Sequence, residues 1–266
     1  MSATRFSRWS GGLRVGADFF ERSLAPSPRA DHPSRGLVDR MTDLAHPGID
    51  VARVHPAIAV FFTDTAELDL LIRSRWRFPF GALWRLLRHA MRAIGQFVLP
   101  AREGRIATRV LDIDRARDGR ADARAVIRTY AERGEVMQVV AYATFEAGGA
   151  RYMSTAFPLP GGQIAGILRL DPIGRDDEGR LAVALTSRGG EAGIWYVIGA
   201  ASIRLPLGEH LALWAAGSPC APGDLDASAL PGATLVGRHE QRVFGVRFVT
   251  HDYWFKPLDR GAPPRT

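Results

Sequence analysis

Apolar and polar residues alternate along most of the chain after Gly104, and a two-residue period is typical of half-buried β-strands. Turn residues such as Gly148-Gly149 and Gly161-Gly162 separate most of the alternating segments. Because parallel strands need long crossover connections, these short gaps predict antiparallel hairpins. The predicted strands cover residues 105–113, 122–131, 135–146, 150–158, 163–171, 180–187, 193–199, 201–215, 233–243 and 246–257.

Strands that follow one another in this way would leave long exposed edges in a single open sheet. Closing the sheet into a barrel, or folding it into two layers, removes those edges. We therefore predict a mainly β fold of the α+β class, either an antiparallel β-barrel or a two-layer β-sandwich of about ten strands, with N-terminal helices. Residues 217–232 hold small residues and three prolines, and predict a surface loop around Cys220.

The chain before Gly104 predicts helices and one further strand. Residues 56–66 and 80–98 have helical character, whereas 67–76 alternates like a strand, although Leu71 breaks the alternation.

The domain organisation follows from a change in composition near residue 48. Residues 1–48 are rich in Ser, Arg, Gly and Pro, and predict a loosely ordered extension in which only residues 17–24 look helical. One β-rich domain is expected over residues 49–258, followed by a tail over 259–266.

The segment 80–98 combines an apolar helical face with a basic face that carries Arg85, Arg88, His89 and Arg92. We expect the apolar face to pack on the sheet and the arginines to be solvated. The alternative is a helix that docks on an anionic membrane surface through its arginines. The residues of the apolar face are Phe80, Leu83, Trp84, Leu87, Met91, Ile94 and Val98.

Charge and composition narrow the picture further. The formal net charge of the 266 residues is +7, and residues 73–109 carry the whole excess, with nine arginines against one acid, Glu103. A single cysteine excludes an internal disulfide framework and a multi-cysteine zinc site. Residues 79–99 have about the length of a membrane span, but the arginines in their middle disfavour insertion. A cytoplasmic location is expected, with the inner membrane face as an alternative.

Several phrases resemble an uncharacterised bacterial family, a domain of unknown function. They are HPAIAVFFTDTAELDL, SRW followed by a helix ending in QFVLP, FPLPGG, GEAGIWYV and IRLPLGEHLALW. The resemblance covers about residues 55–258 and implies no activity, so no functional residue can be transferred. A looser likeness, to lipid-binding β-barrels and to the acetoacetate decarboxylase type of barrel, concerns architecture alone.

The candidate catalytic residues are Glu209, Arg247, His251 and Tyr253. The last three share one face of the final strand, where in a barrel cavity they could hold a carboxylate, enol or phenol; the alternative is an outer, solvated face. Glu209 shares the parity of neighbouring leucines, and a carboxylate buried there must find a partner or raise its pKa. The alternative is a kink at Pro206 that turns Glu209 to water.

Candidate ligand-binding residues lie on other strands. Arg128 is a candidate anion clamp, and Glu191 follows a glycine pair that allows close backbone approach. Their alternatives are a surface arginine and a solvated turn, and for the aromatic candidates it is a plain core. The aromatic candidates are Tyr142, Phe157, Trp195, Trp214 and Trp254.

Metal and cofactor chemistry are disfavoured. His239 and His251 would lie opposite each other across a tight turn, but Glu240 and Asp252 have the wrong parity to complete a zinc site. Lys256, the sole lysine, stands beside a proline near the chain end, a poor place for a Schiff base. We expect no metal and no cofactor.

The leading functional prediction is a β-barrel that binds an apolar small molecule or lipid in an apolar cavity. One alternative is a cofactor-free enzyme, such as an isomerase, cyclase or decarboxylase, that acts on a hydrophobic acid. Another is a peripheral membrane or partner-binding protein that uses the basic helix. Nucleic acid is disfavoured, because no nucleic-acid-binding fold is recognisable.

Overall fold

The computed structural model describes residues 4–12, 14–24, 34–93 and 103–258. Twelve strands form in this part of the chain: β1 (Leu68–Trp76), β2 (Gly104–Asp112), β3 (Arg124–Tyr130), β4 (Val136–Ala147), β5 (Ala150–Leu159), β6 (Gly162–Arg175), β7 (Leu181–Thr186), β8 (Gly193–Ile198), β9 (Ala201–Arg204), β10 (Leu207–Ala215), β11 (Leu235–Val243) and β12 (Val246–Pro257). The helices are α1 (Phe19–Ser23), α2 (Pro56–Thr63), α3 (Phe80–Ala93) and α4 (Arg115–Asp118), with 3-10 turns at Met41–Leu44, Val51–Arg53, Thr65–Glu67 and Ala227–Ala229.

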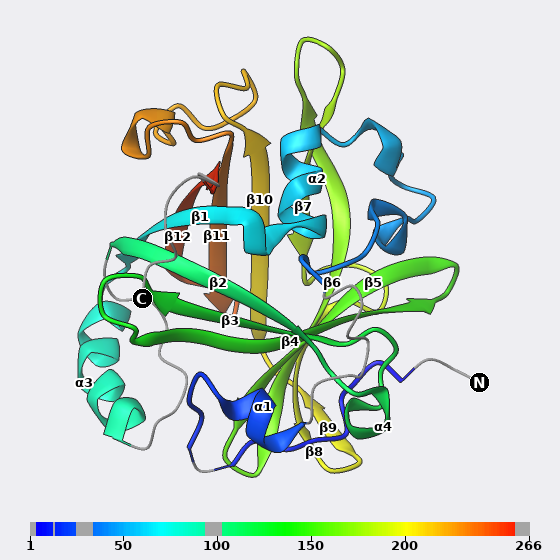
Figure 1. Cartoon of the computed structure of the whole chain (residues 1–266), viewed down its shortest axis with the longest axis vertical. Helices are drawn as coiled ribbons and strands as arrows, with labels where there is room; N and C mark the ends of the chain where they lie inside the picture. The colour runs from blue at the N-terminus through cyan, green and yellow to red at the C-terminus, as the bar shows by residue number, and fades with distance from the viewer. Residues whose placement is uncertain (1–3, 13, 25–33, 94–102, 259–266) are drawn as a thin grey trace.

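The strands form one antiparallel sheet that closes on itself (Figure 1). Its order is β5-β4-β3-β2-β1-β12-β11-β10-β7-β6-β8-β9, and β5 also pairs with β6. The ring from β5 round to β6 is therefore a closed ten-stranded barrel, while β8 and β9 continue the sheet outside it. The predicted fold class is confirmed, and of its two forms the chain adopts the barrel.

The predicted strands all appear, with one division. Residues 201–215 form two strands, β9 and β10, because Pro206 has no backbone N–H to donate to a ladder. The predicted strand 67–76 is β1, and the reason why Leu71 breaks its alternation is now visible. Leu71 packs on the outside of the barrel with Trp214 and Trp254, beneath the loop 217–232.

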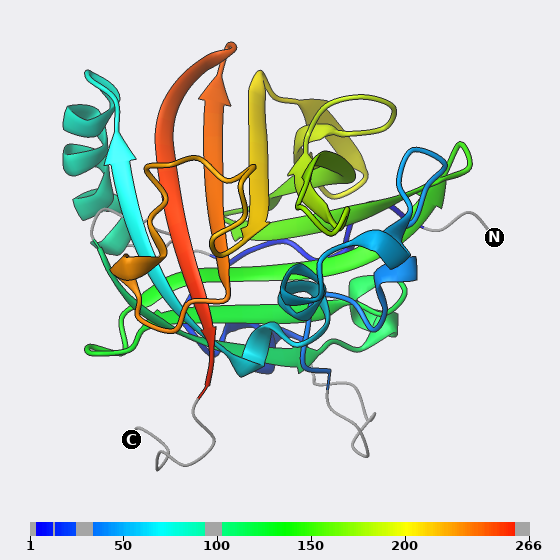
Figure 2. The same ribbon diagram turned by 90° about the horizontal axis from the view of Figure 1, so that it is seen from above.

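The main core fills the barrel, where inward residues of the strands meet the apolar face of α2. Ile58 and Phe62 of this helix are fully buried, and the ring of Phe61 lies edge-on to Phe255 of β12 with a centroid distance of 5.2 Å. Pro56 stands at the start of α2, and the His55 side chain accepts a hydrogen bond from Ala57 N at 3.1 Å. Figure 2 shows α2 beside the strands whose inner faces it covers.

Within residues 1–48, the described part up to Ser23 and Leu24 packs on the outside of the barrel, whereas Leu37, Val38 and Leu44 join the main core. Trp9, Phe19 and Phe20 are buried in a cluster with alanines and branched residues of β3 and β4. Trp9 Nε1 donates to Asp118 Oδ2 at 2.8 Å, and Asp118 forms a buried ion pair with Arg120. The segment assigned to a loosely ordered extension thus supplies several of the buried aromatic rings.

Candidate functional site: a polar pocket inside the barrel

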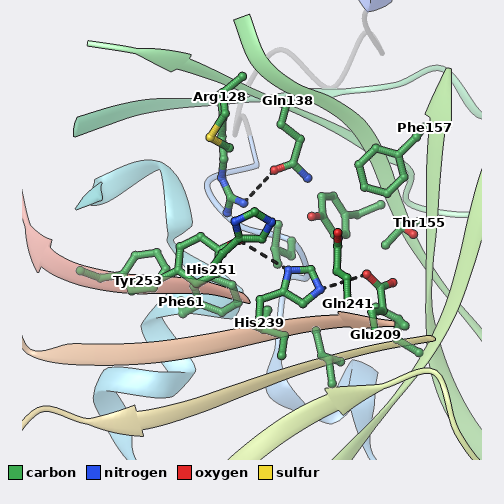
Figure 3. Close-up of a pocket in the computed structure, with 17 residues that line it drawn as sticks. Phe61, Arg128, Gln138, Thr155, Phe157, Glu209, His239, Gln241, His251 and Tyr253 are labelled. Atoms are coloured by element: carbon green, nitrogen blue, oxygen red, sulfur yellow. Dashed lines mark hydrogen bonds and ion pairs between the residues drawn. The ribbon is translucent and has the colours of Figure 1, made fainter. Parts of the chain in front are cut away.

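The inward faces of the strands leave a pocket of about 70 Å³ (Figure 3). Alternation along the strands places the same parity of β10, β11 and β12 on this pocket, so polar residues two apart gather there. Apolar side chains, among them Phe61, Phe157 and Leu211, form the remaining wall. The polar lining residues are Arg128, Gln138, Tyr142, Thr155, Glu209, His239, Gln241, His251 and Tyr253.

Glu209, His239 and Tyr253 form a hydrogen-bonded chain across three adjacent strands. Glu209 Oε2 lies 3.1 Å from His239 Nε2, and the Tyr253 hydroxyl lies 3.5 Å from His239 Nδ1. With a neutral imidazole, Nε2–H donates to the carboxylate and Nδ1 accepts from the tyrosine. The carboxylate that sequence parity placed on an apolar face is therefore inside the barrel and has found a partner.

Gly166 of β6 gives this carboxylate its room. A Cβ at this position would lie 2.9 Å from Glu209 Oε1 and 2.6 Å from Thr155 Oγ1. Any side chain here would displace one of the two groups, so the pocket depends on a glycine in the facing strand.

His251 is almost fully buried and uses only one ring nitrogen. Its Nδ1 lies 2.8 Å from Ser74 Oγ of β1, while Nε2 has no hydrogen-bond partner in the described structure. Burial, with a smaller contribution from His239, lowers the pKa of His251 to about 3. The imidazole is therefore neutral near pH 7, and its Nε2 is available for a hydrogen bond inside the barrel.

Arg128 is the most unusual group of the site. This residue is only 6% exposed, and its Nη1 donates a 3.2 Å hydrogen bond to Gln138 Oε1. Its Nε has no hydrogen-bond partner, and among the described residues the guanidinium forms no ion pair with a carboxylate. Because a buried charge is costly unless it is paired, this arrangement favours an anion from outside the chain.

Two tyrosines add hydroxyl donors. Burial raises the pKa of both Tyr142 and Tyr253, and Arg128 opposes the shift in each case. Both phenols therefore stay protonated near pH 7. The pocket thus combines one cation, one carboxylate–imidazole pair and two phenols within an apolar wall.

The structure places Arg247 and Glu191 outside this pocket. Arg247 is exposed and forms an ion pair with Glu240. Gln241 of β11 pairs with Val249 of β12, but the next residue, Arg242, pairs with Arg247, so Phe248 has no partner in β11. This bulge breaks the parity that links Arg247 to His251. Glu191 lies in an exposed turn and pairs with Arg5 at 3.1 Å.

The three predicted tryptophans lie on outer surfaces of the sheet. Trp195 of β8 packs against Phe6, with a centroid distance of 5.7 Å. Trp214 and Trp254 lie beneath the loop 217–232, where Trp254 Nε1 donates to Asp226 O at 2.8 Å. Neither group borders the pocket.

The remaining candidates divide as follows. Arg128, Tyr142, Phe157, Glu209, His251 and Tyr253 all line the pocket. Arg85 and Arg88 lie on α3, away from the pocket, and the side chain of Arg92 lies outside the described residues.

The sequence pattern indicated His239 only as a metal ligand, and it did not indicate Gln138, Gln241 or Thr155 as pocket residues. The expected juxtaposition of His239 and His251 is confirmed, since the two residues pair across β11 and β12 with ring centroids 6.1 Å apart. The same pairing could have placed His239 in the pocket. In the described part of the chain, no three His, Cys, Asp or Glu residues gather as a metal site would need.

The chain is similar to a protein of Bacillus subtilis (strain 168) named "Uncharacterized membrane protein YndJ", with 27% identity over 261 residues. The alignment covers 95% of this chain and 43% of that protein, so the chain spans less than half of its relative's length. No family model and no solved structure matches the chain. These comparisons agree with an uncharacterised family and supply no activity. No helix among the described residues is long and apolar enough to cross a bilayer.

Proposed function

We propose that the protein binds a small organic acid in the barrel pocket, with the carboxylate of the ligand on Arg128 and its apolar body against the wall. The observation that carries this proposal is the buried guanidinium without an acidic partner. A ligand carboxylate would supply the missing charge and could take the free Nε–H together with a terminal N–H.

The pocket volume limits the size of the ligand. About 70 Å³ is roughly half of an engineered 150 Å³ cavity that holds benzene. A short-chain acid fits this space better than a long-chain lipid. The lipid of the original expectation would need side chains such as Phe157 to move.

The binding proposal is tested with purified wild-type protein and a panel of short carboxylic acids, each beside its neutral amide. Native mass spectrometry would first identify any co-purifying acid, and calorimetry would then measure binding. We expect acids to bind and amides to bind much more weakly. Arg128→Gln should abolish the preference, whereas Arg247→Gln, a surface arginine outside the pocket, should keep it. Equal binding of acids and amides, or no binding of any acid, would contradict the proposal.

A second candidate function is favoured by the Glu209–His239 pair. A carboxylate that orients an imidazole beside a bound acid is the arrangement of a general base, which could remove a proton from the carbon next to the carboxylate. The proton would pass to the pair and return from solvent, as in a cofactor-free isomerase. NMR in D₂O would detect exchange of that proton into a bound acid. Exchange that persists in Glu209→Gln would remove the pair from this role.

A further inference from the structure

Helix α3 presents leucines to solvent on one side. Leu83, Leu86 and Leu87 are 59%, 74% and 48% exposed, and Phe78, just before the helix, is 87% exposed. A surface helix normally turns such residues to the core, and adjoining exposed apolar residues mark an interaction site. The expected single apolar face is thus divided between the barrel and solvent.

The packing of α3 explains this division. The ring of Trp84 stacks on Trp76 of β1, with centroids 5.2 Å apart and planes within 8°, and Phe80 lies 6.0 Å from Phe248 of β12. Because successive helical residues are about 100° apart, the side held through Phe80 and Trp84 leaves the leucines on the adjoining side. The leucines are therefore held outward by aromatic packing.

The surroundings of this surface are basic. The sequence of α3 contains no acidic residue, and Arg77 and Arg85 are exposed. Neither arginine forms an ion pair with another described residue, and Arg85 Nε donates to Gly81 O at 3.3 Å. The surface therefore joins aliphatic side chains to cations that have no counter-ion within the described chain.

A second exposed apolar surface lies on the same side of the molecule as the start of α3. The turn between β11 and β12 exposes Phe244 and Val246, and Figure 2 shows this turn and the start of α3 projecting on the same side. A backbone hydrogen bond links the segment before α3 to β12, since Arg77 N donates to Phe248 O at 3.0 Å.

We propose that α3 docks the barrel on an anionic lipid surface. Leu83, Leu86 and Leu87 enter the boundary between headgroups and acyl chains, while Arg77 and Arg85 contact lipid phosphates. A helix with exposed leucines on one side, an exposed arginine on its polar side and no acids has the chemistry of interfacial helices. Nucleic acid would favour exposed aromatic rings for base stacking, but the large apolar side chains that α3 exposes are all leucines. This inference does not depend on the pocket.

The experiment measures co-sedimentation of the full chain with two kinds of vesicle, phosphatidylcholine alone and phosphatidylcholine mixed with phosphatidylglycerol. We expect binding to the mixed vesicles that weakens between low and physiological salt. Combined Leu83→Gln, Leu86→Gln and Leu87→Gln should reduce the partition coefficient by more than about tenfold. Arg85→Gln should reduce it by about fivefold.

Matched controls come from residues outside α3 and outside the turn between β11 and β12. Ile198 and Ile203 are also exposed aliphatic residues, and Arg133 is an exposed arginine. Ile198→Gln with Ile203→Gln, and Arg133→Gln, should leave vesicle binding unchanged. All variants should keep the wild-type unfolding temperature, because the replaced side chains are exposed.

Three results would overturn the proposal. The first is the absence of binding to the mixed vesicles, and the second is equal binding to both kinds of vesicle. The third is sedimentation of the wild type as a dimer that the leucine variant dissociates, which would assign the surface to a second copy of the chain.

Discussion

Replacing Arg128 by Met should stabilise the ligand-free protein and abolish acid binding. The guanidinium is 6% exposed and has a single neutral hydrogen-bond partner, Gln138. Burying an ion costs several kcal/mol, and one hydrogen bond to a charged group returns about 1.5–3 kcal/mol. Methionine keeps the apolar stem and removes the charge. We expect the free energy of unfolding to rise by about 1–3 kcal/mol, and the unfolding temperature by about 2–4 °C for each kcal/mol.

A matched control lies on the same strand and on the same face. Arg124 is also buried, but it pairs with Asp39 at 2.5 Å and donates to Gly36 O at 3.2 Å. Breaking a buried pair costs about 3–5 kcal/mol, and the 57% exposure of the Asp39 side chain reduces this to about 1–3 kcal/mol. Arg124→Met should therefore destabilise the protein. Two buried arginines are thus expected to give effects of opposite sign.

The assay is urea-induced unfolding followed by circular dichroism, with and without a bound acid. The acid should stabilise the wild type and Arg124→Met, but not Arg128→Met, because ligand binding to the folded state adds to the free energy of unfolding. A loss of stability in Arg128→Met as large as that in Arg124→Met would refute the reasoning. The guanidinium would then be a structural group that holds Gln138.

Three further predictions concern the groups around the site. The pKa of His251 is about 3 in the folded protein and 6.5 in the unfolded chain, so the unfolded state takes up a proton first as the pH falls. The free energy of unfolding should therefore fall between pH 6.5 and pH 3, by up to about 1.4 kcal/mol per pH unit. This pH dependence should be weaker in His251→Asn. Asp118→Asn breaks a fully buried pair with Arg120 and should cost about 3–5 kcal/mol in urea unfolding. Gly166→Ala should destabilise by about 1–3 kcal/mol and weaken acid binding measured by calorimetry.

Each of these predictions has a contrary outcome. Equal pH dependence in wild type and His251→Asn would mean that this imidazole titrates normally in the fold. A cost below about 1 kcal/mol for Asp118→Asn would show that the segment holding Trp9 is not anchored through this ion pair. Unchanged acid binding in Gly166→Ala would show that the Glu209 carboxylate does not need its present position.

The sequence allowed the strands, their antiparallel order and much of the pocket to be predicted, because alternation fixes which residues share a face. His251 and Tyr253 illustrate this, and Glu209 did so despite the nearby proline. The bulge at Phe248 was not predictable, since one extra residue against a partner strand leaves no mark in the pattern. Arg247 was consequently assigned to the wrong side of the strand.

The sequence also did not show which face of each strand points into the barrel. Trp214 and Trp254 are as apolar as core residues, but their aromatic rings are buried by the loop 217–232 on the outer surface. Alternation separates two faces without saying which one lies inward, and a loop that covers the outer face makes both faces apolar. The exposure of the leucines of α3 was not predicted for a related reason. Helical periodicity does not reveal that Trp84 stacks on Trp76, which leaves the leucines facing solvent.

The pairing of β1 with β12 sets the time at which the pocket can form during synthesis. Leu68 lies opposite Pro257, so the ring stays open until nearly all of the described chain has left the ribosome. Contacts between residues so distant in sequence carry a loop-closure cost and slow folding. Until then, polar groups such as Arg128 and His239 remain in water, and the unclosed strand edges are open to wrong pairing. We therefore expect a slowly folding chain that gains from chaperones, with acid binding as a late marker of barrel closure.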